Sequence, residues 1–160
     1  MRNGKQQDIP IQPVDRPILC SPYEEPSLHW VYDTETGAAR KIEDRRPAGY
    51  WWQDRRTGTA EQLRLEGFAE EERDELTLVN LLRDDVRRWR RSGYENATRV
   101  TKQLLVHWAR EDAPRRLFFC QLEAVETVLY LREILASGRR QRWKPALDID
   151  DYHRLCRGEV

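Results

Sequence analysis

A glutamine beside two phenylalanines is the part of this sequence best suited to recognising a nucleobase. Gln121 follows Phe118 and Phe119 in the stretch Arg116–Gly138, RLFFCQLEAVETVLYLREILASG. A carboxamide presents a donor and an acceptor side by side, which matches the N6 and N7 edge of adenine, and an aromatic ring can stack on the base. The same residues also suit ordinary packing at the start of a helix, so their types alone leave both interpretations open.

A run of arginines around a tryptophan is the second candidate site. In the stretch RRWRR the arginines are Arg87, Arg88, Arg90 and Arg91. If Trp89 faces the core of a helix, arginines around it can bind nucleic-acid phosphates. The alternative is a solvated face whose arginines pair with nearby carboxylates such as Asp84 and Asp85.

The residues needed for several kinds of catalysis are missing. The sequence has no GxxxxGK[ST] loop to hold phosphates, and no GxSxG motif. Its histidines and cysteines are scattered: His29, His107 and His153, and Cys20, Cys120 and Cys156. This spacing argues against a metal site and against a disulfide framework. We therefore expect no metal, no bound cofactor and no catalysis from this chain alone.

Composition is consistent with a soluble, cytoplasmic protein. Charged residues make up 35% of the chain and apolar residues 39%. Lys+Arg and Asp+Glu both number 28, so net charge by itself predicts neither a nucleic-acid partner nor an acidic one. No stretch approaches the roughly 20 apolar residues that a membrane span requires, so we expect no membrane association.

The elements that must position these residues indicate an α+β fold that is mainly α. Residues 1–17 carry three prolines and predict an extended arm. Region 18–69 predicts a short β-hairpin around a glycine-containing loop, followed by a polar connection. Region 70–138 predicts about three amphipathic helices, including the glutamine helix. Region 139–160 predicts an irregular tail, basic and then acidic, with room for one helical turn over 152–156.

Apolar residues recur at helical spacing from Glu75 onward. The first predicted helix opens with Asp74 and Glu75, where the helix dipole favours acidic residues, and stops at Gly93. Its apolar face is predicted to hold Leu76, Val79, Leu82, Val86 and Trp89. This period is the strongest local signal in the chain.

Two more helices are predicted after the first. The second is capped by Asn96 and ends near Asp112, whereas the third has Pro114 in its first turn and runs to Gly138. The predicted buried residues of the second helix are Val100, Leu104, Leu105 and Trp108. Those of the third are Phe118, Leu122, Val125 and Leu129.

Three stretches, taken in order, resemble one protein family. They are PILCSPYEEPSLHW, KIEDRRPAGYW and RRLFFCQLEAVETVLYLREI. Together with the segment VNLLRDDVRRWRRSGYENATRVTKQLLVHW, they resemble the amino-terminal region of type III restriction endonuclease Res-like subunits, which belong to the DEAD/DEAH-box helicase superfamily. The resemblance covers roughly Pro17 to Leu135.

This resemblance implies specific roles for the glutamine helix. Gln121 would recognise adenine, and Phe118 or Phe119 would stack on it. The phosphate loop and magnesium-binding motif of that family have no counterpart in this sequence. ATP and Mg²⁺ are therefore implied only for a complete parent enzyme of DNA restriction and phage defence.

The expected partners are the remaining helicase and nuclease portion, and DNA. This chain would then be an amino-terminal piece, truncated before the phosphate loop. Two alternatives remain open at this point: a non-catalytic DNA-binding or protein-interaction module, and a decayed gene fragment.

Overall fold

The computed structural model describes residues 13–33, 36–52 and 72–159. They form a mainly helical α+β fold, as the sequence predicts. The chain divides into two compact units. One comprises residues 1–20 and 26–74, and the other comprises Ser21–Glu25 together with residues 75–160. Most of the predicted arm and the predicted connection over 53–69 fall outside the described residues.

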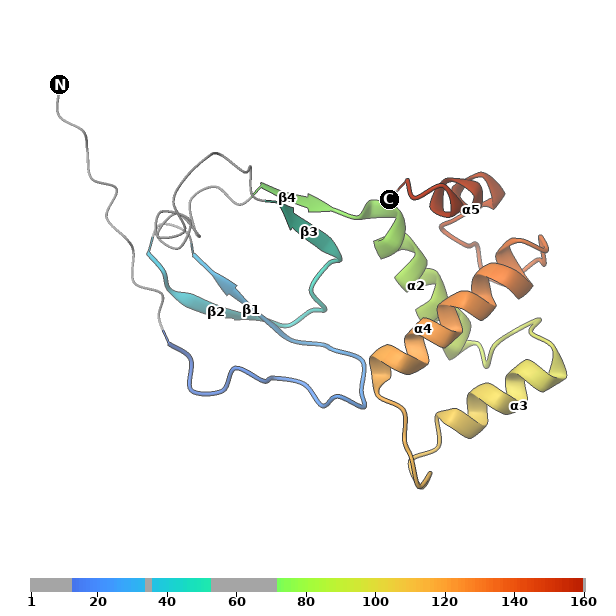
Figure 1. Ribbon diagram of the computed structural model, residues 1–160, viewed down its shortest axis with the longest axis horizontal. Coiled ribbons are helices and arrows are strands. Elements are labelled where there is room, and N and C mark those ends of the chain that lie inside the picture. Colours follow the sequence, from blue (N-terminus) through green and yellow to red (C-terminus); the bar gives the residue numbers. More distant parts are fainter. Residues whose placement is uncertain (1–12, 34–35, 53–71, 160) are drawn as a thin grey trace. The chain divides into compact units, whose positions relative to one another are not determined.

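The predicted β-hairpin is present in the first unit (Figure 1). Strand β1 (His29–Tyr32) pairs antiparallel with β2 (Ala39–Ile42). Within the turn, the Gly37 N–H donates to the Asp33 carbonyl at 2.8 Å. Gly37 has a φ of +67°, a left-handed conformation that glycine adopts without a steric penalty. The glycine therefore sets the turn.

A second two-stranded sheet was not predicted from the sequence. It pairs β3 (Gly49–Trp52) with β4 (Glu72–Glu75). The prediction that Asp74 and Glu75 open a helix is wrong, because both lie in β4 and the first turn of the next helix has no acidic residue. Acidic residues have low intrinsic strand preference, so pairing with an aromatic strand outweighs local propensity here.

The second unit consists of helices (Figure 1). They are α2 (Thr77–Arg91), α3 (Arg99–Trp108), α4 (Phe119–Leu129) and α5 (Ile149–Cys156), with the π-helix η1 (Tyr130–Leu135) continuing directly from α4. Helix α4 packs against both α2 and α3, and α5 packs against η1. Because α4 touches two helices, its position depends on both.

The core of this unit is centred on the fully buried Trp89. Its ring lies 5.1 Å from that of Tyr94, edge to face, and 5.6 Å from that of Tyr130. The Trp89 Nε1–H donates to the Glu95 carbonyl at 2.9 Å, so the indole is buried with its polar atom satisfied. The prediction that Trp89 faces the core is confirmed.

Helix α2 follows its predicted period except at its start, where Leu76, predicted on the buried face, is the N-cap and only partly buried. Leu82 and Val86 are buried as expected, but Leu78 occupies the buried face, whereas Val79 is partly exposed. The helix ends before Gly93, whose φ of +71° matches the predicted glycine stop.

Helix α3 differs from prediction in its cap and in its faces. Its N-cap is Thr98, whose hydroxyl accepts from the Thr101 N–H at 3.2 Å, and not Asn96. The helix ends at Trp108, earlier than predicted. Val100 and Leu104 were predicted to be buried, but both are exposed.

Helix α4 begins later than predicted, and it continues into the π-helix η1, whose turns are wider than those of an α-helix. Pro114 lies in a turn before the helix, and Phe118, predicted to be buried, is exposed. In η1, the buried residues are Tyr130, Ile134 and Leu135. Ile134 and Leu135 are consecutive, and both belong to the core of this unit.

The tail is held by a carboxylate buried beneath it. Asp85 is fully buried on α2 and accepts from the backbone N–H groups of Ala146, at 2.9 Å, and Leu147, at 3.0 Å. Helix α5 then begins at Ile149, three residues before the turn that the sequence suggested. Asp85 thus fixes a segment distant in the sequence.

Removing this acceptor should destabilise the protein. We expect Asp85→Ala to lower the free energy of unfolding by about 2–4 kcal/mol, because two backbone N–H groups lose their partner. Asp84→Ala is the matched control, since Asp84 is half exposed and pairs with Arg87 at the surface; its cost should stay below about 1 kcal/mol. Urea denaturation followed by circular dichroism measures both. Equal costs would contradict the anchoring role of Asp85.

The same residue predicts a pH dependence. Burial raises the pKa of Asp85 above 3.8, against the opposing effect of its backbone hydrogen bonds. The folded state therefore keeps this proton to higher pH than the unfolded chain, so ionisation of Asp85 lowers stability as pH rises through that interval. The quantity to follow is the difference between the unfolding free energy of the wild type and that of Asp85→Asn. We expect this difference to decrease as pH rises through the interval between the unfolded and folded pKa of Asp85. Denaturation at several pH values tests this, and a rising difference would contradict it.

Candidate functional site

The predicted adenine-recognising glutamine lies at the start of α4. Phe118 is the N-cap, and its backbone N–H donates to the Gln121 Oε1 atom at 3.0 Å. This bond uses one lone pair of the carboxamide oxygen. The second lone pair and both N–H groups of the side chain can still bind a ligand. Gln121 is exposed. Its side chain is therefore held by the helix terminus while the rest of its polar edge faces solvent.

The two neighbouring phenylalanines have different environments. Phe118 is 45% exposed, whereas Phe119 is 8% exposed. The Arg90 guanidinium lies 5.0 Å from the centre of the Phe119 ring, in a cation–π contact. Of the two predicted stacking residues, Phe118 is the one that a planar ligand can reach, and Phe119 holds α4 to α2.

A short segment far upstream completes this surface. Tyr23 lies in Ser21–Glu25, which we call the strap, and its ring centre is 5.3 Å from that of Phe118. The Arg116 guanidinium lies 4.7 Å from the Tyr23 ring centre. The Phe119 N–H donates to the Pro22 carbonyl at 2.8 Å. Sequence reasoning assigned no role to Tyr23, because no local spacing connects it to a helix that begins so far along the chain.

Two of the four predicted phosphate-binding arginines form internal ion pairs. Arg87 pairs with Glu25 of the strap at 2.6 Å and with Asp84 at 3.0 Å. Arg90 pairs with Glu25 at 3.2 Å and with Glu126 of α4 at 2.5 Å. Asp84 is one of the carboxylates expected from the sequence, whereas Glu25 and Glu126 come from distant segments.

Glu126 is a fully buried carboxylate, so its charge must be compensated by partners inside the protein. Arg90 approaches it with two guanidinium nitrogens, at 2.9 and 2.5 Å, and the Tyr94 hydroxyl donates to it at 2.7 Å. Burial and this hydrogen bond raise the pKa of Tyr94. A buried carboxylate is tolerated only when it is paired and hydrogen-bonded in this way. We call Arg90, Glu126, Glu25 and Tyr94 the ionic network.

The other two arginines are more accessible. Arg88 lies 3.6 Å from Asp85 and 6.0 Å from the centre of the Trp143 ring. Arg91 is exposed and forms no ion pair with any described residue. The structure therefore divides the arginine run into two internal members and two outer ones.

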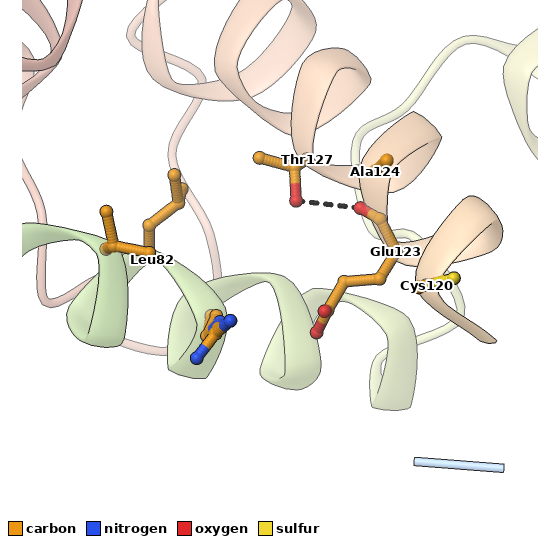
Figure 2. Close-up of a pocket in the computed structure, with 7 residues that line it drawn as sticks. Leu82, Cys120, Glu123, Ala124 and Thr127 are labelled. Carbon is orange, nitrogen blue, oxygen red and sulfur yellow. Dashed lines mark hydrogen bonds between the residues drawn. The ribbon is translucent and has the colours of Figure 1, made fainter. Parts of the chain in front are cut away.

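A groove with a volume of about 320 Å³ lies between α2 and α4 (Figure 2). Its lining is Val79, Leu82, Arg83, Cys120, Glu123, Ala124 and Thr127. Figure 2 shows the Thr127 hydroxyl bonded back to the Glu123 carbonyl of its own helix, at 2.7 Å. The groove is thus mainly apolar, and it opens on a different side of α4 from Gln121, which does not line it.

The described residues contain no group of three or more histidine, cysteine, aspartate or glutamate side chains placed to hold a metal ion. The three cysteines are free. No helix in the described part of the chain is long and apolar enough to cross a membrane. No protein-family model, curated protein or solved structure matches this chain.

The ionic network predicts a large difference between two adjacent arginines. Arg90→Ala leaves Glu126 buried without its cation, so we expect a loss of about 3–5 kcal/mol in the free energy of unfolding. Arg91→Ala is the matched control, and its cost should lie within about 0.5 kcal/mol. Thermal and urea denaturation measure both values. A mild effect of Arg90→Ala would show that Glu126 does not depend on this pair.

Proposed function

We propose that the start of α4 is the adenine-recognising part of a nucleotide site whose phosphate-binding part belongs to another polypeptide segment. The observation that carries this proposal is the Gln121 carboxamide, which is fixed by the Phe118 N–H and exposed beside an exposed aromatic ring. One lone pair and the amide N–H groups remain for the N6 and N7 atoms of adenine. A ring at this position can stack on the base.

The support beneath Gln121 favours recognition, because a preorganised group loses less entropy on binding. Helix α4 is held near its start by the Pro22 carbonyl and by Arg90 above Phe119. Further along, Glu126 ties it to α2. The glutamine therefore projects from a braced helix and not from a loop.

This site offers few groups that could bind the phosphates of a nucleotide. The sequence has no glycine-rich phosphate loop. Arg87 and Arg90 are already paired with carboxylates. A base held by one carboxamide and one stacked ring gains only a few kcal/mol, which corresponds to a dissociation constant of about 1 mM or weaker. We therefore propose recognition without hydrolysis for this chain alone.

The resemblance to restriction-type DEAD/DEAH helicases supplies the biological setting of the proposal. The chain would act in the cytoplasm as the amino-terminal piece of an ATP- and Mg²⁺-dependent DNA restriction enzyme. The remaining helicase and nuclease portion would be its partner. A DNA-binding module built on the arginine run has less support, because half of that run, Arg87 and Arg90, is paired with carboxylates of the same chain.

Adenine recognition is testable on the isolated chain. We expect millimolar adenosine to shift the side-chain amide NMR signal of Gln121, and inosine to shift it much less, because inosine presents an oxygen where adenine has its N6 amino group. In Gln121→Ala, the signals of Phe118 should lose their preference for adenosine. Gln103→Ala, which removes an exposed glutamine from α3, is the matched control and should keep it.

Two outcomes would contradict the proposal. One is an equal response of the wild-type protein to adenosine and inosine. The other is micromolar ATP binding, or ATP turnover, by the purified chain without a companion polypeptide.

A further inference from the structure

Exposed basic side chains alternate along the segment that leads from η1 to α5. Arg140, Arg142 and Lys144 are exposed, whereas the residue that follows each of them is partly buried. The side chain of Arg142 is 92% exposed. The three cations therefore face solvent, and the residues between them face the protein.

The backbone of this segment is held against the helical unit while two of its cations are left free. The Arg140 carbonyl accepts from the Asn96 side-chain amide at 2.5 Å, and the Lys144 carbonyl accepts from the Arg88 guanidinium at 3.4 Å. The side chains of Arg140 and Lys144 form no ion pair with any described residue. A ligand that binds these cations therefore meets a segment whose backbone is already ordered.

Helix α2 adds two cations beside this segment. Arg88 is half exposed, and its guanidinium lies 6.0 Å from the centre of the Trp143 ring. Arg91 is exposed one helical turn later, so it is the neighbour of Arg88 on the surface of α2. We call the five cations the basic strip: Arg88, Arg91, Arg140, Arg142 and Lys144.

Two carboxylates compensate only part of the charge of the basic strip. Asp85 is fully buried and lies 3.6 Å from Arg88, and Glu95 lies 2.9 Å from Arg142. The other three members of the strip keep their charge uncompensated within the described residues. Acidic residues resume at Asp148, which is occupied in capping α5. The strip is thus positive although the whole chain has a formal net charge of zero.

We propose that the basic strip binds the phosphodiester backbone of a nucleic acid without recognising its sequence. A nucleic-acid backbone presents phosphates in a row, and arginine and lysine bind them through charge-assisted hydrogen bonds. Gln121 takes no part in this binding, so the inference does not depend on adenine recognition.

The make-up of the strip favours a nucleic acid over other acidic partners. The buried centre of a protein–protein interface is rich in aromatic residues and poor in charge, whereas the exposed side chains of residues 139–144 are all cationic. A membrane also attracts cations, but stable anchoring needs a second, apolar signal that these exposed residues do not supply.

The test uses the full chain and two labelled oligonucleotides of about 20 nucleotides, a thymidine strand and a duplex of G·C pairs. Neither contains adenine, so the outcome is independent of Gln121. In fluorescence anisotropy titrations, we expect dissociation constants of about 10⁻⁶ to 10⁻⁴ M. If each of the three uncompensated cations holds one phosphate, the affinity should fall about 10- to 20-fold between roughly 50 and 150 mM salt.

The double variant Arg140→Ala, Lys144→Ala removes two of these three cations. We expect it to weaken binding by about tenfold or more at low salt, and to make the remaining affinity much less sensitive to salt. The matched control is Arg40→Ala, Lys41→Ala, which removes one exposed arginine and one exposed lysine from β2 in the other unit. It changes the net charge equally and should leave the affinity unchanged.

Circular dichroism should show both double variants folded, since all four side chains are exposed. Failure of the wild type to bind either oligonucleotide, affinity that does not respond to salt, or an equal loss in the two double variants would overturn the proposal. Tighter binding of the wild type to phosphatidylserine vesicles or to a polyglutamate peptide than to both oligonucleotides would also overturn it.

Discussion

The buried carboxylate of Glu126 is the constraint on which the helical unit depends. It lies inside the protein, and Arg90 is the cation that reaches it. Arg90 comes from α2 and also pairs with Glu25, so one guanidinium joins two helices and the strap. The cost of burying this charge is offset only in the assembled arrangement. The ionic network thereby favours one packing of these three segments over alternatives that apolar contacts alone would permit.

The same arrangement separates two chemical roles that the sequence places side by side. Residues 90 and 119 point into the structure and hold the helices together, whereas Phe118 and Gln121 remain at the surface. Half of the arginine run that resembles a phosphate-binding surface, namely Arg87 and Arg90, thus contributes to assembly. The exposed polar edge that can meet a ligand is a neutral amide at a helix terminus, which suits a base better than a phosphate.

Local patterns predicted the elements that depend on local physics. The hairpin around Gly37 and the apolar period of α2 are both present, because turn geometry and helical periodicity are encoded in neighbouring residues. Predictions failed where distant contacts decide the outcome. The strap, the pairing of β3 with β4, and the pairing of Glu126 with Arg90 have no local signal. The faces of α3 were misassigned because apolar residues occur around most of that helix, so its period does not identify the buried side.

The division of the chain into two units has a consequence for its assembly. Since residues 21–25 belong with the helical unit while the residues on both sides belong to the other, the backbone passes between the units at positions 20/21, 25/26 and 74/75. A recombinant fragment starting at Glu75 would therefore lack the Pro22 carbonyl and the Glu25 carboxylate. During synthesis, residues 21–25 leave the ribosome long before the helices that they contact. The helical unit is therefore complete only after the long backbone loop between residues 25 and 75 has closed.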